Sequence, residues 1–446
     1  MRPVKIKNQR FDIFVYRIYR LFSCAVFFIF YPLFRLYTRI TGQYRDGLGQ
    51  RTGRYRAGVT DRLYGTPRIW LHAVSVGEVN VAGAILDCLH KRLPDCSLIV
   101  STTTEQGFRA AVDRFGARAS CIYAPLDFVG AVKRALATLQ PDILVCLETE
   151  IWPNWLHEAH KKGIRTALLN GRISMRTINH YMKIRPLIRS ALSHMDAFSM
   201  IQRADAKRIK MLGAAPDRIT VNGNAKFDVL QKRADASVKT VMRQLYNIKK
   251  GQKVLVAGSV RNREDLILLD VYQKIVRIFP KTLLIIVPRH IQRATAIGKH
   301  VGEHGFSYRY RSTLGSGGRP IYASVVVVDT MGELMATYSI ASIAFCGGSL
   351  VPLGGQNILE AAVWGIPVFF GPSMEDFMDA RALLDTSGGG IQVADGNELA
   401  EKMIYYLNNP GKAAATGQLA RKAVATNSGA AEKHAEVICR ILASGK

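Results

Sequence analysis

Residues 343–372, which read IAFCGGSLVPLGGQNILEAAVWGIPVFFGP, decide the fold of this chain. An apolar run at 343–346 leads into a glycine-rich turn at 347–355, a helix-like run at 357–364 and a second apolar run at 368–370. This order of strand, loop, helix and strand is typical of parallel sheets. Glycine loops let the backbone approach a ligand, and free amides at a helix start suit an anion such as a phosphate. The stretch predicts either a phosphate-binding loop or an ordinary βαβ connection whose glycines only make turns.

The rest of the chain alternates apolar, strand-like runs with helix-like segments. In the first half the runs lie at 69–73, 98–102, 121–125, 143–148 and 166–171, and in the second half at 254–259, 283–290, 325–330, 343–348 and 368–372. Runs without regular polar positions are typical of strands buried on both faces of a parallel sheet. The sequence therefore predicts an α/β protein with two Rossmann-like domains facing across a cleft, preceded by a membrane-anchoring helix.

Polar residues and glycines that follow these runs are the first functional candidates. Ligands in such sheets bind beyond the carboxyl ends of the strands. The positions concerned are 75–78, Glu148, Ser259, Arg289 and 347 onward.

The chain of 446 residues is long enough for two domains, each with its own core. We expect a membrane anchor with a basic juxtamembrane segment at 1–45 and an N-terminal Rossmann-like domain at 46–229. A polar linker at 230–252 then leads to a C-terminal Rossmann-like domain with terminal helices at 253–446.

The composition is strongly basic. Lys and Arg (61) outnumber Asp and Glu (34), which gives a formal net charge of +27 and implies anionic partners. No zinc-finger spacing, RNP-like motif or long basic tail is present, so we expect no nucleic-acid partner. The seven cysteines include no CxxC pair and the ten histidines no HExxH motif, which argues against a bound metal and for a reducing compartment.

The N-terminal segment predicts a membrane contact. Residues 1–56 carry twelve Lys or Arg against two acidic residues, Asp12 and Asp46. Residues 21–34 read LFSCAVFFIFYPLF and hold no charge, but a spanning helix needs about 20 apolar residues. No small-residue cleavage site follows Phe34, which argues against a cleaved signal peptide. Either a marginal signal anchor or an interfacial helix fits the segment, and both hold the protein on a membrane.

Seven motifs, taken in order, resemble those of the bacterial 3-deoxy-D-manno-octulosonic acid (Kdo) transferases. They are HAVSVGEV (72–79), LETEIWPN (147–154), NGRIS (170–174), VNGNAKFD (221–228), VPRH (287–290), DTMGEL (329–334) and GGSLVPLGGQNILEAA (347–362). The resemblance implies a membrane-anchored glycosyltransferase of the GT-B fold that moves Kdo from CMP-Kdo onto a lipid A precursor.

The resemblance assigns catalytic roles to three residues. Glu78 becomes the general base for the acceptor hydroxyl, and Glu148 and Lys226 stabilise the transition state. Each also has a plain structural reading: a first-turn acid for Glu78, a strand-end acid in an ion pair for Glu148, and a solvated lysine for Lys226. Glu150 is an alternative to Glu148, because residues two apart along a strand share a face.

Donor binding maps by resemblance onto three segments of the second half. They are Pro288 and Arg289, then Met331, Gly332 and Glu333, and finally Asn357, Ile358, Leu359 and Glu360. By this resemblance Arg289 and the amides at the Asn357 helix start meet the phosphate, and Glu360 accepts hydrogen bonds from the ribose hydroxyls. The turn at 331–333 offers backbone groups to the cytosine. CMP carries a single phosphate, so we expect no metal and no other cofactor.

Two departures from the family pattern concern the donor. Gln356 stands where the family commonly has the histidine of GGHN, and 259–265 reads SVRNRED where the family commonly has STHEGEE. Glutamine donates a hydrogen bond but carries no charge, which weakens phosphate stabilisation by that side chain. Arg261 returns positive charge to the neighbourhood, so we expect changes in donor affinity and pH dependence rather than in the reaction.

The resemblance implies inverting transfer of Kdo to a hydroxyl of a tetraacylated lipid A precursor in lipopolysaccharide core biosynthesis. The body then lies on the cytoplasmic face of the inner membrane, where a basic, anchored N-terminal half attracts the phosphates of the precursor. One alternative is another GT-B enzyme with a different sugar nucleotide, either an epimerase or a transferase. The other is a membrane-bound carbohydrate-binding protein without catalysis, which the presence of Glu78 disfavours.

Overall fold

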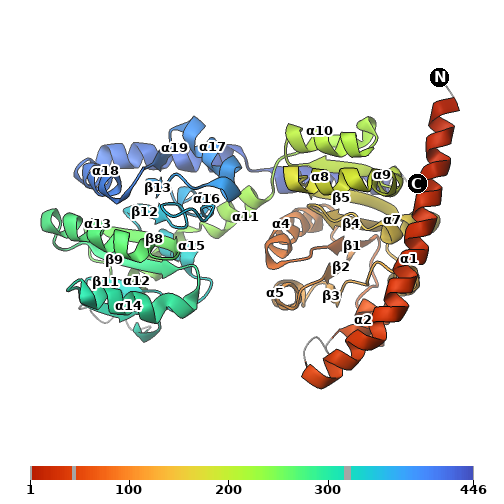
Figure 1. The fold of residues 1–446 in the computed structure, drawn as a ribbon, viewed down its shortest axis with the longest axis horizontal. Helices are drawn as coiled ribbons and strands as arrows, with labels where there is room; N and C mark the ends of the chain where they lie inside the picture. Colours follow the sequence, from red (N-terminus) through yellow and green to blue (C-terminus); the bar gives the residue numbers. More distant parts are fainter. Residues whose placement is uncertain (1–2, 43–46, 316–322, 445–446) are drawn as a thin grey trace. The chain divides into compact units, whose positions relative to one another are not determined.

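The chain divides into two compact units in the computed structural model, which describes residues 3–42, 47–315 and 323–444 (Figure 1). The first unit comprises Met1–Val229 and Ser428–Lys446, and the second comprises Leu230–Asn427. Among the charged residues counted in the N-terminal segment, Arg2, Arg45 and Asp46 lie outside the described residues.

The first unit is built on a seven-stranded parallel sheet of order β3-β2-β1-β4-β5-β6-β7. Its strands are β1 (Arg68–His72), β2 (Ser97–Thr102), β3 (Ser120–Tyr123), β4 (Ile143–Leu147), β5 (Arg165–Gly171), β6 (Ala197–Met200) and β7 (Ile219–Val221). Its helices are α1 (Pro3–Thr41), α2 (Leu48–Arg51), α3 (Ala57–Thr60), α4 (Val76–Arg92), α5 (Glu105–Phe115), α6 (Val129–Leu139), α7 (Pro153–Lys161), α8 (Met175–Lys183), α9 (Arg185–Ser193), α10 (Arg203–Leu212), the 3₁₀ helix η1 (Pro216–Arg218) and α20 (Ala430–Ala443).

The second unit holds another seven-stranded parallel sheet, of order β10-β11-β9-β8-β12-β13-β14. Its strands are β8 (Val254–Val260), β9 (Leu283–Pro288), β10 (Tyr308–Tyr310), β11 (Val325–Val327), β12 (Ile343–Cys346), β13 (Val368–Phe370) and β14 (Gly390–Gln392). Its helices are α12 (Ala236–Leu245), α13 (Glu264–Ile278), η2 (Ile291–Arg293), α14 (Ala294–Glu303), η3 (Arg311–Thr313), α15 (Leu334–Tyr338), α16 (Leu359–Ala362), η4 (Glu375–Phe377), α17 (Met378–Ser387), α18 (Gly396–Asn408) and α19 (Pro410–Thr426). The chain first crosses from one unit to the other within α11 (Lys226–Arg233).

Both faces of each sheet are buried, which explains the apolar runs in the sequence. In β1, Ile69 and Leu71 join one core cluster and Trp70 joins another, and all three side chains are 0% exposed. Successive side chains of a strand point to opposite faces, so helices cover the sheet on both sides. The predicted α/β class with two parallel sheets is confirmed. The sequence missed β6, β7, β10 and β14, which have three or four residues each and lie at or beside sheet edges.

The C-terminal helix corrects the expected division of the chain. The apolar face of α20, with Ala435 and Ile438, packs into the same core cluster as α4 of the first unit. His434 Nδ1 lies 2.8 Å from Ser199 Oγ, and Asp228 Oδ1 accepts the Gly429 N–H at 2.7 Å. Residues 428–446 therefore return to the first unit, because their apolar face completes its core. The expected linker at 230–252 belongs to the second unit, where α12 packs against α15.

The stretch at 343–372 folds as β12, a glycine loop, α16 and β13, but its helix is shorter than the expected 357–364. Asn357 precedes α16, and its Oδ1 accepts the Leu359 N–H at 3.2 Å. The helix ends at Ala362, and a turn follows that leads to Gly365 with a φ of 71°. Glycine adopts this left-handed conformation readily, and it ends the helical turn.

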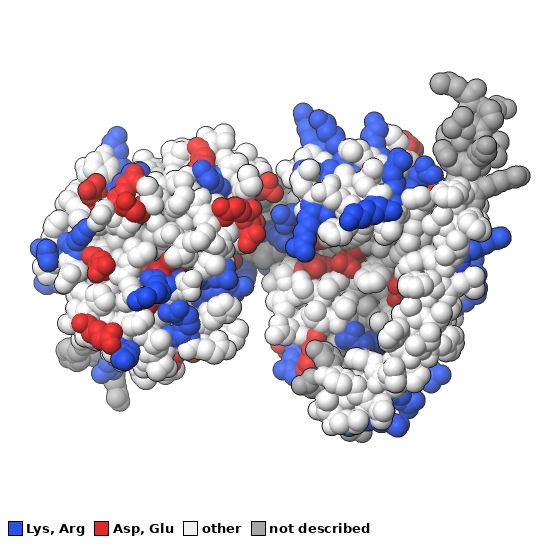
Figure 2. Space-filling model, in the orientation of Figure 1, with Lys and Arg blue, Asp and Glu red and all other residues white. Residues whose placement is uncertain are grey.

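Helix α1 lies along the first unit and is longer than the apolar run that predicts it. It has 39 residues, and Phe11–Thr41 is long and apolar enough to cross a membrane. Asp12 forms an ion pair with Arg189 at 2.6 Å, and the Tyr19 hydroxyl donates to Asp127 Oδ2 at 2.7 Å. Many large apolar side chains of α1 are exposed, beside the exposed Arg17, Arg35 and Arg39, and Figure 2 shows a broad uncharged surface over this helix.

Candidate active site

The carboxyl ends of β1 and β4 carry three acidic residues of the first unit. The two strands are parallel neighbours, with His72 opposite Cys146, so the segments that follow them meet at one edge of the sheet. Glu78 lies in the first turn of α4. Glu148 follows β4 directly with a left-handed φ of 54°, and Glu150 comes two residues later.

Glu78 is a half-buried carboxylate held by its own loop. Its Oε2 accepts the Val74 N–H at 2.9 Å, and its Oε1 accepts the Ser75 hydroxyl at 3.4 Å. Burial raises the pKa of Glu78 to about 7, and the negative charges of Glu148 and Glu150 add to the rise. A carboxyl group that titrates near neutral pH is suited to take a proton during a reaction.

Glu148 and Lys226 form an ion pair in the same unit. Lys226 Nζ lies 2.7 Å from Glu148 Oε1, and the two side chains are 44% and 18% exposed. Asn170, at the end of β5, holds the loop that carries the lysine, because its Oδ1 accepts the Ala225 N–H at 2.9 Å. The motifs NGRIS and VNGNAKFD therefore meet at the carboxyl edge, where they place a cation against the acid after β4.

Glu150 has different partners, which separates it from Glu148. Its Oε2 accepts the Trp152 indole N–H at 2.8 Å and lies 3.9 Å from Nε2 of the buried His72. Burial raises the pKa of Glu150 and lowers the pKa of His72 to about 4, so this histidine is neutral at pH 7. The ammonium partner at this edge therefore belongs to Glu148.

A buried carboxylate organises the glycine loop of the second unit. Glu264, the first residue of α13, is 0% exposed. It accepts the backbone N–H of Arg261 and those of residues 348–350, at 2.6–3.0 Å. A Cβ added at Gly347 lies 2.7 Å from the Ser259 carbonyl oxygen, so the loop needs glycine here. Glu264 therefore binds the amides of residues 348–350, so these amides are not free for a phosphate.

The amides that remain for an anion lie closer to α16. The Gly354 N–H donates to Ser373 Oγ, and the Gly355 N–H donates to the Gly348 carbonyl. Across the described part of the chain, no protein acceptor binds the N–H groups of residues 356–358. The Ile358 and Leu359 side chains are 0% and 9% exposed, and the Leu359 N–H already donates to Asn357 Oδ1, so Ile358 has only its backbone N–H to offer a donor.

Arg289, Asn357 and Glu360 come together in the second unit, as predicted. Glu360 Oε1 accepts the Asn357 side-chain amide at 3.3 Å. Burial raises the pKa of Glu360, while this hydrogen bond and the charges of Arg233 and Arg289 oppose the rise. Arg289 is exposed and follows Pro288, the last residue of β9. A cation and a hydrogen-bond acceptor thus face the carboxyl edge of this sheet.

The side chain of Glu333 holds the turn at 331–333 in place. Glu333 is bound by Arg311, whose Nε lies 2.9 Å from Oε2, and by the Thr330 hydroxyl at 2.8 Å. Met331 is 84% exposed and Gly332 has a φ of 82°. The carboxylate of Glu333 therefore holds the turn, which leaves the backbone of the turn and the exposed Met331 for a ligand.

Three residues with structural roles at these edges were missed or left without a role by the sequence interpretation. Glu264 lies five residues after Ser259, where the predicted strand-like run ends, but sequence spacing does not show that distant amides converge on it. Asn170 was quoted only within a motif, and His72 only as the first residue of another. The sequence signal of Asn170 and His72 is a polar residue at the end of a buried strand, next to last in β5 and last in β1. Within residues 3–42, 47–315 and 323–444, no group of three or more His, Cys, Asp or Glu is arranged to hold a metal ion.

Comparison with known proteins identifies the family. Residues 46–229 match the family model described as 3-Deoxy-D-manno-octulosonic-acid transferase (kdotransferase). The 3-deoxy-D-manno-octulosonic acid transferase of Bordetella pertussis is 30% identical over 373 residues, which cover 82% of this chain and 85% of that protein. The enzyme of the same name from Haemophilus influenzae is 29% identical over 400 residues, covering 88% and 91%. A bifunctional glycosyltransferase/methyltransferase of Fusobacterium nucleatum is 34% identical over 344 residues, and this chain spans about half (52%) of its length.

Solved structures show the same fold at low identity. The UDP-GlcNAc 2-epimerase of Neisseria meningitidis superposes with a TM-score of 0.58 at 12% identity, covering 84% of this chain and 100% of that one. Anabaena HepE superposes with a TM-score of 0.55 at 12% identity, covering 85% and 100%. These likenesses identify the two α/β units as a GT-B fold. The sequence relatives show that the chain belongs to the family of 3-deoxy-D-manno-octulosonic acid (Kdo) transferases, which are glycosyltransferase enzymes.

Proposed function

We propose that this protein transfers Kdo from CMP-Kdo to a hydroxyl of a tetraacylated lipid A precursor, with inversion at the anomeric carbon, in lipopolysaccharide core biosynthesis. The observation that carries the proposal is Glu78, an accessible carboxylate at a strand end whose pKa is raised to about 7. The ion pair of Glu148 with Lys226 at the same edge supports it.

The proposed reaction is a single displacement. The acceptor hydroxyl gives its proton to Glu78 while its oxygen bonds to the anomeric carbon of Kdo, and the bond from that carbon to the phosphate oxygen of CMP breaks. Attack from the face opposite CMP inverts the configuration. CMP leaves with the electron pair of the broken bond, so negative charge grows on its phosphate.

Glu148 and Lys226 then act on the charges that develop. In this proposal the ammonium of Lys226 is held at 2.7 Å by Glu148 before the substrates arrive, so no side chain must reorganise during transfer. The carboxylate favours the positive, oxocarbenium-like carbon, and the ammonium favours the departing phosphate.

The donor nucleotide is assigned to the second unit. Arg289 and the N–H groups of residues 356–358 receive the phosphate, and Glu360 accepts hydrogen bonds from the ribose hydroxyls. The backbone of 331–333 faces the cytosine. A single phosphate leaves less charge to neutralise than a diphosphate does, so we propose that transfer needs no metal ion.

The membrane side of the proposal rests on α1. The polar contacts of Asp12 and Tyr19 with the body and the ring stacking of Phe27 on Phe128 hold this helix against the body, while many of its large apolar side chains stay exposed. We propose that α1 lies in the interface of the inner membrane with the body on the cytoplasmic side, since a helix tied to the body along its length is better placed to lie on a bilayer than to cross it.

One assay tests the proposed reaction. Detergent-solubilised protein is incubated with CMP-Kdo and tetraacylated lipid A precursor, and the lipid is analysed by mass spectrometry, with and without EDTA. We expect a mass increase of one or more Kdo units in both cases. An unchanged lipid with CMP-Kdo, together with turnover of a uridine diphosphate sugar, would reject the proposal in favour of another GT-B activity.

A further inference from the structure

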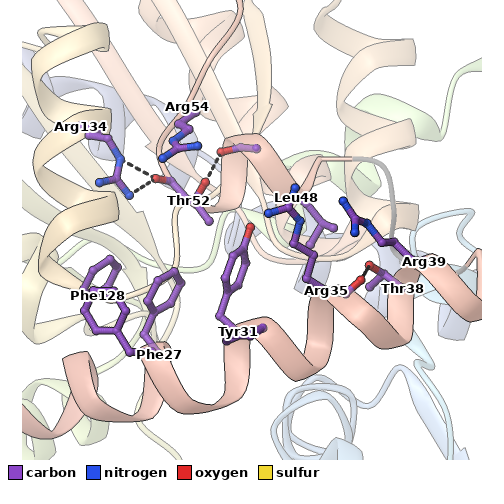
Figure 3. Close-up of a pocket in the computed structure, with 13 residues that line it drawn as sticks. Phe27, Tyr31, Arg35, Thr38, Arg39, Leu48, Thr52, Arg54, Phe128 and Arg134 are labelled. Carbon is purple, nitrogen blue, oxygen red and sulfur yellow. Dashed lines mark hydrogen bonds between the residues drawn. The ribbon is translucent and has the colours of Figure 1, made fainter.

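A hollow of about 620 Å³ lies in the first unit between α1 and the body. Figure 3 shows its lining side chains, with Tyr31, Arg35 and Arg39 rising from α1 toward the segment that carries Thr52 and Arg54. The volume is typical of small-ligand sites, which occupy about 300–1,000 Å³. Glu78, Glu148 and Lys226 are not among the lining residues, so the hollow is separate from the candidate active site.

The wall of the hollow on α1 is one face of the helix. Its lining residues recur three and four positions apart, which places them on the same side. They are Phe27, Phe28, Tyr31, Pro32, Arg35, Thr38 and Arg39. Ring stacking of Phe27 on Phe128, with 4.1 Å between ring centres, closes one end of the hollow against the body. The hollow therefore opens at the boundary between the body and the apolar helix.

The charge of the hollow is strongly positive. Four arginines line it, and none of the described lining residues is acidic. Arg134 is held in the wall, because its Nε and Nη2 donate to the Thr52 carbonyl at 2.9 and 2.6 Å. Arg35, Arg39 and Arg54 are exposed and, within the described ranges, have no carboxylate partner. Like charges around one hollow repel, so an anion bound between them is favoured.

The chemistry of the lining selects the kind of anion. Guanidinium groups bind phosphate through paired charge-assisted hydrogen bonds. The other part of the wall is aromatic, with Phe27, Tyr31 and Phe128, and suits the glycerol and first methylenes of a lipid. Basic residues beside an interfacial helix attract anionic lipids. The complementary ligand has an anionic phosphate at its head and an acyl chain that continues along α1.

We propose that this hollow binds the phosphate headgroup of an anionic phospholipid from the bilayer on which α1 lies. The bound lipid fixes the junction between α1 and the body. The site positions the protein on the membrane and takes no part in the reaction, so it does not depend on the identity of the donor or acceptor sugar.

The test compares matched charge changes inside and outside the hollow. The pocket variant is Arg35→Gln with Arg54→Gln, and the control is Arg17→Gln with Arg56→Gln, which removes the same charge from exposed positions of the same segments. Full-length protein in neutral detergent is titrated with dioleoyl phosphatidylglycerol and observed by native mass spectrometry. Dioleoyl phosphatidylcholine serves as the zwitterionic lipid. A single Arg39→Gln variant replaces the double variant if circular dichroism shows that the latter does not fold.

We expect wild type and control to retain one phosphatidylglycerol, and the pocket variant to bind it at least about tenfold more weakly. Equal loss in the pocket and control variants would overturn the proposal, because general surface charge would then explain binding. No lipid on the wild type would overturn it too. Preferential, pocket-dependent binding of the lipid A precursor over phosphatidylglycerol would reassign the hollow to the acceptor. Kdo transfer to the lipid A precursor is measured in detergent without added phospholipid on the same samples, so failure of the proposed reaction is recognised separately.

Discussion

Replacing Glu78 by glutamine should stabilise the folded protein at high pH while it abolishes activity. The folded protein keeps the proton of Glu78 up to about pH 7, whereas the unfolded chain releases it near the ordinary pKa of 4.5. The folded state therefore binds more protons between these values, so this residue lowers the unfolding free energy as pH rises from 4.5 through 7. Glutamine does not titrate in this range, so the Glu78→Gln protein does not lose unfolding free energy in this way.

The magnitude follows from the shift. A rise from 4.5 to about 7 corresponds to about 3 kcal/mol at about 1.4 kcal/mol per pKa unit. Glu78 is only half-buried, so water screens part of this electrostatic free energy. We therefore expect Glu78→Gln to raise the free energy of unfolding by about 1–2 kcal/mol at about pH 8. At about pH 4 the gain should vanish, because both states of the wild type are then protonated.

Denaturant unfolding in detergent, followed by tryptophan fluorescence, measures this gain. Trp70, Trp152 and Trp155 lie in the first unit with Glu78, and Trp364 lies in the second. Other titrating groups are shared by the two proteins, so their contributions cancel in the difference. Glu401→Gln, an exposed change on α18, is the control and should show no pH-dependent gain. A Glu78→Gln protein that is less stable than wild type at about pH 8, or a difference independent of pH, would refute the reasoning.

Three further predictions concern the same edges of the sheets. The wild-type kcat/KM should rise with pH and level off above about 7, since Glu78 must be deprotonated to act as a base; a profile that falls over this range would contradict the assignment. Lys226→Gln should lower kcat about 100-fold and leave the KM for CMP-Kdo nearly unchanged, because the ammonium acts on charge that appears in the transition state; steady-state kinetics with both substrates distinguish this from lost binding. Glu264→Gln should lower the free energy of unfolding by about 2–3 kcal/mol and speed amide hydrogen exchange at residues 348–350, because one amide oxygen cannot replace two carboxylate oxygens as acceptor for four N–H donors. Unchanged exchange at these residues would show that the loop keeps its conformation without Glu264.

The strand cores could be read from the sequence because they are buried on both faces. Runs such as 143–147 and 283–287 have no polar positions, and this pattern is specific to covered parallel sheets. The candidate site residues came largely from motifs at or after strand ends, and the structure brings Lys226 into contact with Glu148 and places Glu78 near Glu148 in the first unit.

Other features depend on contacts between distant residues, which spacing does not encode. An amphipathic helix at 430–443 fits either core, and only the structure shows it packed beside α4. Glu148 and Glu150 share a strand-end pattern, yet Lys226 pairs with the former and Trp152 with the latter. The amides of residues 348–350 in the glycine loop donate to Glu264, more than eighty residues earlier, and no local spacing indicates this contact.

The account depends most on Glu78 as the base that accepts the proton of the acceptor hydroxyl. A single-turnover measurement of Kdo transfer by wild type and Glu78→Gln, with CMP-Kdo binding measured on the same samples, tests this directly. We expect the variant to bind CMP-Kdo as the wild type does and to transfer Kdo at least about 100-fold more slowly. Transfer within a few fold of the wild-type rate would contradict the central claim.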